Sequence, residues 1–340
     1  MLKNWRLWIG LLISLVFLYW VISQVKDVGQ VVESLKRAQY GYVVPALAVY
    51  FLGVWIRAIR WRYLLMPTHG VSSRRLFPVV VIGYMANDVL PVRMGELVRA
   101  YVLGLREEIS KATGLSTIFV ERVFDGLTMI AFLAGVAAFI PLAASLKQIA
   151  VATAVLFLAL SAGILVLAVQ SRRAERLVGY VVRLLPAGAR GPVQKIASSM
   201  LVGLGVMRSG RAVVAVLVLS IAAWLCEAGM YYLIALGFFP EVPFYVMLLT
   251  VAVANLGTMI PSSPGYVGTF DALAVFTLGL FGIGNEVAVG YTAVLHAALI
   301  FPITFLGFFF LWRENLTLGG LRRAPISAPA SVDGLGQGGV

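Results

Sequence analysis

Six ionisable residues lie close together in the first half of an otherwise apolar sequence. Glu121 and Asp125 are four residues apart, and Glu96 and Arg99 are three apart, so each pair would share one face of a helix. Because an ionised group is costly to bury away from water, these residues are candidates for a functional site. The six are Arg93, Glu96, Arg99, Glu121, Arg122 and Asp125.

Two kinds of chemistry fit this group, and the sequence leaves both open. Arginine binds phosphate through two parallel N–H donors, so Arg93, Arg99 and Arg122 suit an anionic headgroup. The carboxylates of Glu121 and Asp125 would then orient the arginines or bind an amine. Alternatively, the charges form a structural salt-bridge network that joins one membrane segment to the next.

A second polar group occurs near residue 260. Its expected binding residues are Asn255, Ser262, Ser263, Gly265, Gly268 and Asp271. Asp271 would either cap the following helix or act as a buried proton carrier or amine ligand. Glu227 is a further candidate for carrying a proton, whereas His296, alone on an apolar helix, is more typical of a packed, hydrogen-bonded histidine.

The elements that carry these residues must lie in lipid. Hydrophobic residues make up 61% of the 340 and charged residues only 12%, against about 45–50% and about 25% in soluble domains. We predict an all-α polytopic membrane protein with about six full transmembrane helices, because the apolar runs are long enough to cross a bilayer. The predicted spans are 7–25, 42–65, 113–140, 149–169, 212–236 and 287–311.

Two further apolar segments, 76–97 and 244–283, are interrupted by proline, glycine and polar residues. Backbone groups freed by such a break must find protein or water partners inside a bilayer. We therefore predict two opposed re-entrant helical hairpins with a polar cavity between them, and Asn87 joins the expected binding residues. The expected hinge positions are Pro91, Gly95, Pro261 and Pro264.

The basic residues predict the orientation. Most Lys and Arg residues fall on the inner side if both termini are cytoplasmic, which also explains the net charge of +12 without nucleic-acid binding. No small-residue cleavage site follows the first helix, so we expect it to stay uncleaved. The halves 1–140 and 149–312 then repeat the same segment order with opposite orientation, as in an inverted-topology repeat.

Residues 1–315 are predicted to form one transmembrane domain. The loop 170–211 mixes basic and apolar residues at helical spacing, so we expect amphipathic helices on the inner leaflet. The tail 316–340 is predicted to be disordered. Arg57 and Arg60 lie near Trp61 at the end of the second span, and we interpret them as part of an aromatic belt whose arginines reach the interface.

No sequence pattern for catalysis is present. The chain has two histidines and one cysteine, and it contains no metal-ligand spacing, no Walker A sequence and no Gly-x-Ser-x-Gly. We therefore expect neither enzyme activity nor a cofactor.

Three motifs, in this order, resemble the transmembrane region of lysylphosphatidylglycerol synthases, the flippase-like domain family, over about residues 5–315. They are Asn87…Pro91-Val92-Arg93-Met94-Gly95-Glu96…Arg99, then Glu121-Arg122…Asp125, then Pro261-Ser262-Ser263-Pro264-Gly265…Gly268…Asp271. In relatives fused to a synthase domain, this region moves an aminoacylated phospholipid between leaflets. Where many relatives have Pro-Gly-Gly, this chain has Pro264-Gly265-Tyr266.

The resemblance implies a polar motif made of the six ionisable residues and a second loop made of Pro264, Gly265 and Gly268. We expect a stand-alone member without the synthase domain, so lysyl transfer is not implied. The predicted function is a lipid flippase of a prokaryotic cytoplasmic membrane, moving a phospholipid or another anionic lipid-linked headgroup.

Two alternatives stay open: a non-transporting membrane subunit of a lipid-linked glycosyltransferase or lipid-modification system, and a membrane-embedded lipid-modifying enzyme. The expected partners are anionic lipid headgroups and a lipid-synthesis enzyme.

Overall fold

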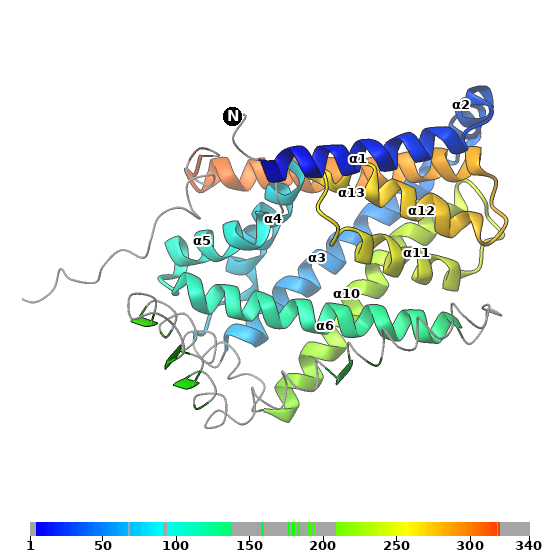
Figure 1. The fold of residues 1–340 in the computed structure, drawn as a ribbon. Helices are drawn as coiled ribbons and strands as arrows, with labels where there is room; N and C mark the ends of the chain where they lie inside the picture. Colours follow the sequence, from blue (N-terminus) through cyan, green and yellow to red (C-terminus); the bar gives the residue numbers. More distant parts are fainter. Residues whose placement is uncertain are drawn as a thin grey trace, which may run out of the picture.

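The computed structural model describes residues 5–66, 69–90, 94–137 and 209–317, with isolated positions between 155 and 194 and residue 319. Within these ranges the chain forms helices and no strand (Figure 1). The helices are α1 (Trp5–Gln24), α2 (Val28–Arg37), α3 (Val43–Leu65), α4 (Ser73–Val89), α5 (Gly95–Glu107), α6 (Lys111–Ala137), α10 (Gly210–Leu236), α11 (Phe244–Gly257), α12 (Thr269–Gly279) and α13 (Asn285–Arg313). Single 3-10 turns occur at Tyr40–Tyr42 and Pro264–Tyr266.

Three helices are long and apolar enough to cross a membrane: Tyr40–Leu65, Gly210–Leu236 and Asn285–Arg313. They coincide with three of the predicted spans. The pair α1 and α2 would be a fourth, although α2 bends away from α1 by 87°. The described chain thus has three to four candidate spans rather than six.

Two other predicted spans have different outcomes. Span 149–169 lies outside the described residues, as do most of the loop 170–211 and most of the tail 316–340. The predicted span 113–140 is the 27-residue α6, which carries the charged residues Glu121, Arg122 and Asp125.

Each of the two interrupted segments forms a pair of helices on either side of a break. α4 packs against α5 and α11 packs against α12 (Figure 1). The second pair lies within the predicted range 244–283, but the first is longer than the predicted 76–97 because α5 continues to Glu107. Charged residues such as Arg99 and Arg106 made this helix resemble a loop in the sequence.

The core arises from long pairings between helices distant in sequence. α3 lies along α10, α4 along α13 and α11 along α6. α1 covers the break between α11 and α12, and its small residues Gly10 and Ser14 face that loop. The backbone N–H of Ser263 donates to Ser14 Oγ at 2.8 Å. Small residues allow such a close backbone approach.

Candidate functional site

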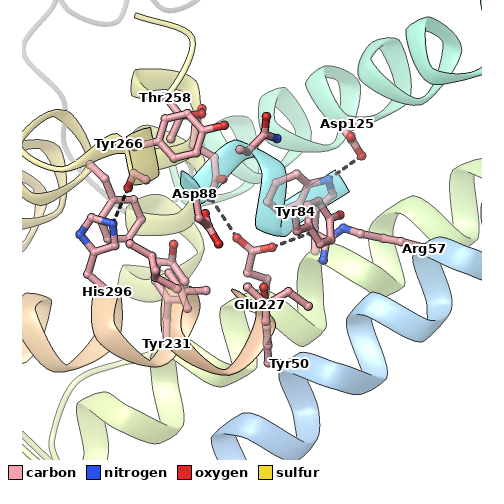
Figure 2. Close-up of a pocket in the computed structure, with 18 of the residues that line it drawn as sticks. Tyr50, Arg57, Tyr84, Asp88, Asp125, Glu227, Tyr231, Thr258, Tyr266 and His296 are labelled. Atoms are coloured by element: carbon pink, nitrogen blue, oxygen red, sulfur yellow. Dashed lines mark hydrogen bonds and ion pairs between the residues drawn. The ribbon is translucent and has the colours of Figure 1, made fainter. Parts of the chain in front are cut away.

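A cavity of about 150 Å³ lies where the two broken helix pairs meet (Figure 2). The C-terminal end of α4 contributes Asn87 and Asp88, the C-terminal end of α11 contributes Asn255, and the turn after α11 contributes Gly265 and Tyr266. The ionisable residues of its wall are Arg57, Asp88, Glu96, Arg122, Asp125, Glu227 and His296. The aromatic residues are Tyr50, Tyr84, Trp224, Tyr231, Tyr266 and Phe270.

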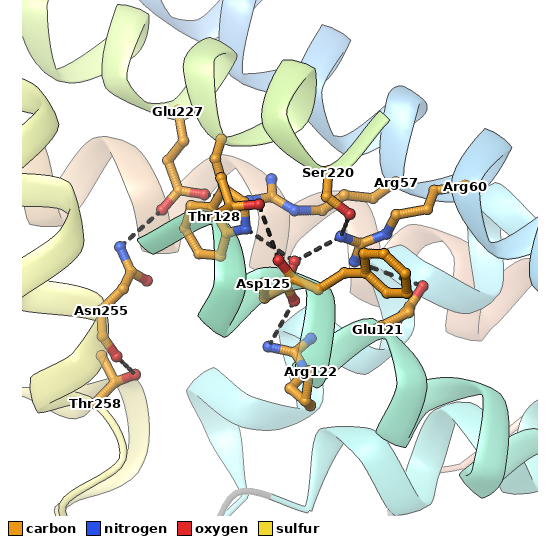
Figure 3. A network of polar contacts seen from close by, with 12 residues as sticks. Arg57, Arg60, Glu121, Arg122, Asp125, Thr128, Ser220, Glu227, Asn255 and Thr258 are labelled. Atoms are coloured by element: carbon orange, nitrogen blue, oxygen red, sulfur yellow. Dashed lines mark hydrogen bonds and ion pairs between the residues drawn. The ribbon is translucent and has the colours of Figure 1, made fainter. Parts of the chain in front are cut away.

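Asp125 is the centre of a buried polar network that joins α3, α6 and α10 (Figure 3). Its Oδ1 accepts from Arg60 Nη1 at 2.6 Å and from Trp224 Nε1 at 2.8 Å. Its Oδ2 lies 3.5 Å from Arg122 Nη1. Arg60 Nη1 also donates to Ser220 Oγ at 2.8 Å. Both carboxylate oxygens are therefore engaged, which is what a buried charge requires.

Glu121 joins α5 to α6. Arg99 donates to it through two nitrogens, at 2.8 Å and 3.3 Å, and stacks on the ring of Trp61 at 4.2 Å. Arg60 Nη2 lies 3.7 Å from the same carboxylate. Arg99 is 3% exposed and Glu121 is 0% exposed, and neither lines the cavity. For these two residues the structure thus has the salt-bridge arrangement that the sequence left as the alternative.

Arg57 and Glu227 form a third link, between α3 and α10. Arg57 Nη2 and Glu227 Oε2 are 2.6 Å apart, and the guanidinium lies 4.7 Å from the ring of Trp224. The other oxygen of Glu227 accepts from Asn255 Nδ2 of α11 at 3.2 Å. This link ends at the cavity wall, because Arg57, Glu227 and Asn255 all line it.

The interpretation of Arg57 and Arg60 as interfacial arginines is wrong. They are 5% and 1% exposed, and neighbouring Trp61 is fully buried and donates to Thr117 Oγ1. A stretch of Arg and Trp near a helix end suits both an interface and a buried network. What distinguishes them is the presence of acidic partners, and the partner of Arg57 is Glu227, 170 residues away. The sequence signal for buried arginines was the presence of carboxylates, Asp125 and Glu227, within other predicted spans.

Asp271 and His296 make a separate arrangement beside the cavity. Asp271 Oδ2 accepts from the backbone N–H of Gly268 at 2.8 Å, so the capping interpretation of Asp271 is confirmed. Its Oδ1 is 2.7 Å from His296 Nδ1, and His296 Nε2 is 2.8 Å from the carbonyl oxygen of Gly265. His296 is 8% exposed, as expected for a packed and hydrogen-bonded histidine.

The structure brings about half of the predicted binding residues to the cavity. Those that line it are Asn87, Glu96, Arg122, Asp125, Asn255 and Gly265. The others that the structure describes lie in the Arg99–Glu121 pair or in the loop and helix start beside α1: Arg99, Glu121, Ser262, Ser263, Gly268 and Asp271. Arg93 and Pro91 lie outside the described residues.

The predicted hinge positions that the structure describes flank the two breaks. Gly95 begins α5, and its N–H donates to Asn87 Oδ1 at 2.8 Å. Pro261 and Pro264 lie between α11 and α12. Three residues there have positive φ: Gly265 at 68°, Tyr266 at 59° and Gly268 at 91°. Tyr266 thus adopts a backbone conformation that favours glycine.

Several residues of the cavity wall were missed by sequence reasoning. Asp88, whose Oδ2 accepts from Thr304 Oγ1 at 2.7 Å, follows Asn87 at the end of α4. Because Asp88 lies next to Asn87 in the interrupted segment 76–97, its position could have identified it as a residue of the cavity wall. The tyrosines Tyr50, Tyr84 and Tyr231 offered none, because tyrosine in an apolar helix is common in packed cores.

Comparisons with known proteins support one family. The sequence profile of the lysylphosphatidylglycerol synthase TM region matches residues 7–307. A UPF0104 membrane protein of Methanothermobacter thermautotrophicus is 24% identical over 301 residues, which cover 82% of this chain and 87% of that protein. Glycosyltransferase AglD of Haloferax volcanii is 30% identical over 315 residues, covering 83% of this chain but only 50% of AglD. No solved structure matches the chain.

The matched region runs from the first described helix into the last, and it contains every residue of the cavity wall. The chain therefore belongs to the lysylphosphatidylglycerol synthase transmembrane-region family of integral membrane proteins.

Proposed function

We propose that this protein is a lipid translocase that passes a polar headgroup through the cavity between the two broken helix pairs. The observation that carries the proposal is the cavity itself, a polar space enclosed by apolar helices. In hydrocarbon, interrupted helices and ionisable residues persist where they line a cavity or a substrate path. A volume of about 150 Å³ suits part of a headgroup, while the hydrocarbon tails stay in the bilayer.

Arg122 is the residue we assign to the anionic part of the headgroup. Among the described residues its Nε has no hydrogen-bond partner, and its Nη1 is 3.5 Å from Asp125. Its side chain is 40% exposed, whereas that of Arg60 is 1% exposed with a carboxylate at 2.6 Å. Of the two arginines that line the cavity, Arg57 is buried with a carboxylate at 2.6 Å, so Arg122 is the more available for phosphate. Arg93 belongs to the same proposal through the sequence motif.

The remaining polar residues of the wall would contact the rest of the headgroup. Asn87 and Asn255 end the helices α4 and α11, and Glu96 lies in the first turn of α5. Asp125 orients Arg122, and Gly265 allows a headgroup to approach the backbone of the turn. The proposed hinges are Pro91, Gly95, Pro261 and Pro264. The loop between α11 and α12, which contains Ser262, Ser263 and Gly268, would move as the headgroup passes.

The helix order supports an inverted repeat as part of the proposal. The helices α3 to α6 and α10 to α13 follow the same sequence of a long helix, two short helices around a break, and a long helix. Their packing corresponds too, because α4 lies along α13 as α11 lies along α6. We propose that both short pairs are re-entrant hairpins, and that both termini face the cytoplasm of a prokaryotic cell.

Reconstitution into liposomes tests the function. Headgroup-labelled phospholipids and a polyprenyl-phosphate sugar are placed in both leaflets, and the accessible fraction is measured with a membrane-impermeant reagent. Arg122→Gln should slow exchange at least about tenfold, as expected for loss of a charged hydrogen bond of about 1.5–3 kcal/mol. The control is Glu33→Gln, which removes a carboxylate of an exposed pair on α2. Absence of exchange with every lipid offered, or wild-type exchange by Arg122→Gln, refutes the proposal.

A second candidate is a membrane subunit of a glycosyltransferase system. It is favoured by the similarity to half of a protein named glycosyltransferase AglD. In this case the cavity would hold a lipid-linked substrate for an enzyme partner. Co-purification of a glycosyltransferase with the tagged chain, combined with no exchange by the chain alone, would select this candidate over translocation.

A further inference from the structure

Asp271, His296 and Gly265 form a continuous series of hydrogen bonds between α12, α13 and the turn at Pro264–Tyr266. Figure 2 shows His296 beside Tyr266 of this turn. The imidazole is held on both sides, by a carboxylate oxygen at 2.7 Å and by a backbone carbonyl oxygen at 2.8 Å. The second oxygen of the carboxylate is also engaged, by the N–H of Gly268.

The hydrogen bonds that join Asp271, His296 and Gly265 require one proton more than a neutral histidine supplies. A carbonyl oxygen only accepts, so His296 Nε2 must donate to Gly265. An ionised carboxylate also only accepts, so a hydrogen bond between Nδ1 and Asp271 needs a second proton. A neutral imidazole carries one N–H and cannot satisfy both acceptors. The additional proton could lie on either group, and the higher basicity of imidazole places it on His296, as a doubly protonated imidazolium facing the Asp271 carboxylate.

The pair stands between two spaces of different character. His296 lines the polar central cavity, and it also lines an apolar groove of about 350 Å³ between α1, α12 and α13. Asp271 lines the groove, and Ile300 lines both spaces. The groove is otherwise bordered by residues such as Leu18 and Val21 of α1. Separation of the turn from α13 at this point would join the polar space to the lipid-facing side.

Other ionisable groups line the same cavity as His296. Asp88 of α4 faces His296 across the cavity, and Glu227 and Tyr231 of α10 and Tyr266 of the turn line the same space. Glu227 is neutralised by Arg57 at 2.6 Å. α1, which packs on α12 and α13, presents apolar side chains there. The remaining ionisable residues of the cavity wall are Tyr50, Tyr84, Glu96, Arg122 and Asp125. Asp88, whose Oδ2 accepts from Thr304 Oγ1, is the carboxylate outside the pair whose charge acts on His296.

We propose that Asp271 and His296 form a proton-binding site that couples lipid movement to protonation, with the turn at Pro264–Tyr266 as the element it holds. The Asp271 carboxylate holds the proton on Nδ1, so the imidazolium loses its proton from Nε2 to water in the central cavity, and His296 becomes neutral. The lone pair of Nε2 then faces the carbonyl oxygen of Gly265 at 2.8 Å, which is a repulsive contact. The turn separates from α13, and the cavity opens toward the groove. This inference rests on the proposed translocase function.

Protonation can be tested without measuring transport. The chain has only two histidines, so full-length protein labelled with 15N-histidine in nanodiscs gives signals from His69 and His296 alone. The exposed His69 is identified by its loss in His69→Gln. We expect both ring nitrogens of His296 to carry a proton at neutral pH in the wild type, and only one in Asp271→Asn. A bare ring nitrogen on wild-type His296 at neutral pH overturns the proposal.

Coupling is tested by lipid exchange in liposomes from about pH 5 to about pH 9. The lipid exchange rate of the wild type should vary with pH as expected for the titration of one proton. Asp271→Asn and His296→Gln should lose this pH dependence. Glu33→Gln, in an exposed pair far from the turn, should keep it. A pH-independent wild-type rate refutes the coupling. Absence of exchange at every pH refutes the translocase function, and the 15N signals still decide the proton-binding site.

Discussion

The arginine side chains of this protein differ in burial and in how closely a carboxylate binds them. Arg60 and Arg99 are almost fully buried and bound to carboxylates, so their main effect is to hold α3 and α5 against α6. Arg122 is partly exposed, and its contact with Asp125 is 3.5 Å, whereas Arg60 and Arg99 have carboxylates at 2.6 Å and 2.8 Å. Charge alone therefore does not mark a ligand-binding arginine; exposure and a loosely held guanidinium do.

At the residue scale we predict that Arg99→Ala is a folding variant. It should lower the free energy of unfolding by about 3–5 kcal/mol, because it leaves the buried Glu121 with Arg60, at 3.7 Å, as its remaining cationic partner among the described residues. The matched control is Arg37→Ala, which breaks an exposed ion pair with Glu33 of similar length, 2.7 Å, and should cost about 0.5 kcal/mol or less. Equilibrium unfolding in mixed micelles measures both. Equal losses in the two variants would contradict the structural role of Arg99.

The break between α11 and α12 shows how an element positions the cavity wall. α11 ends at Gly257, and the prolines at 261 and 264 prevent the helix from continuing. Positive φ angles at Gly265 and Gly268 then turn the chain, and Asp271 caps the start of α12. α1 fixes the loop from outside, since a Cβ at Gly268 would collide with the carbonyl oxygen of Ser14.

At the element scale we predict a difference between two glycines that both have positive φ. Gly268 has φ 91° and Gly282 has φ 77°, but a Cβ at Gly282 would meet no atom within 4 Å. Gly282→Ala should cost about 1–2 kcal/mol for the left-handed backbone alone. Gly268→Ala should cost clearly more, because α1 must also shift. Thermal unfolding in detergent compares them, and equal costs would show that α1 does not constrain the loop.

On the scale of the whole molecule, the helix order and the packing pattern fit two copies of one four-helix unit, α3 to α6 and α10 to α13. The cavity lies where the ends of α4 and α11, corresponding helices of the two units, come together. A pseudo-twofold arrangement explains why polar residues from both halves of the sequence meet in one place. If the twofold axis lies in the membrane plane, as we propose, the two units have opposite orientation in the bilayer.

Cysteine labelling in intact cells tests that orientation. The only native cysteine, Cys226, is replaced by serine, and single cysteines are placed at exposed positions. Arg74→Cys and Ser110→Cys flank α4 and α5 and should react with an impermeant maleimide only after permeabilisation. Gln30→Cys and Glu241→Cys should react in intact cells. Reaction of Arg74→Cys and Glu241→Cys from the same side would exclude the inverted repeat.

The sequence by itself determined the lipid environment, the three helices that are long and apolar enough to cross a membrane, and the places where helices break. These are local properties, because hydropathy over about 20 residues and the backbone limits of proline and glycine act without regard to distant segments. Family membership was also visible in short motifs. The length of α5 was missed because its charged residues resemble those of a loop.

Only the tertiary structure decided which polar residues neutralise one another and which face the cavity. Arg57 finds Glu227, and Arg60 finds Asp125, across separations of 170 and 65 residues. His296 completes its hydrogen bonds with Asp271 and Gly265 from other elements. In a low-dielectric interior a charge is stable only beside its partner, and the packing of helices distant in sequence sets where that partner lies.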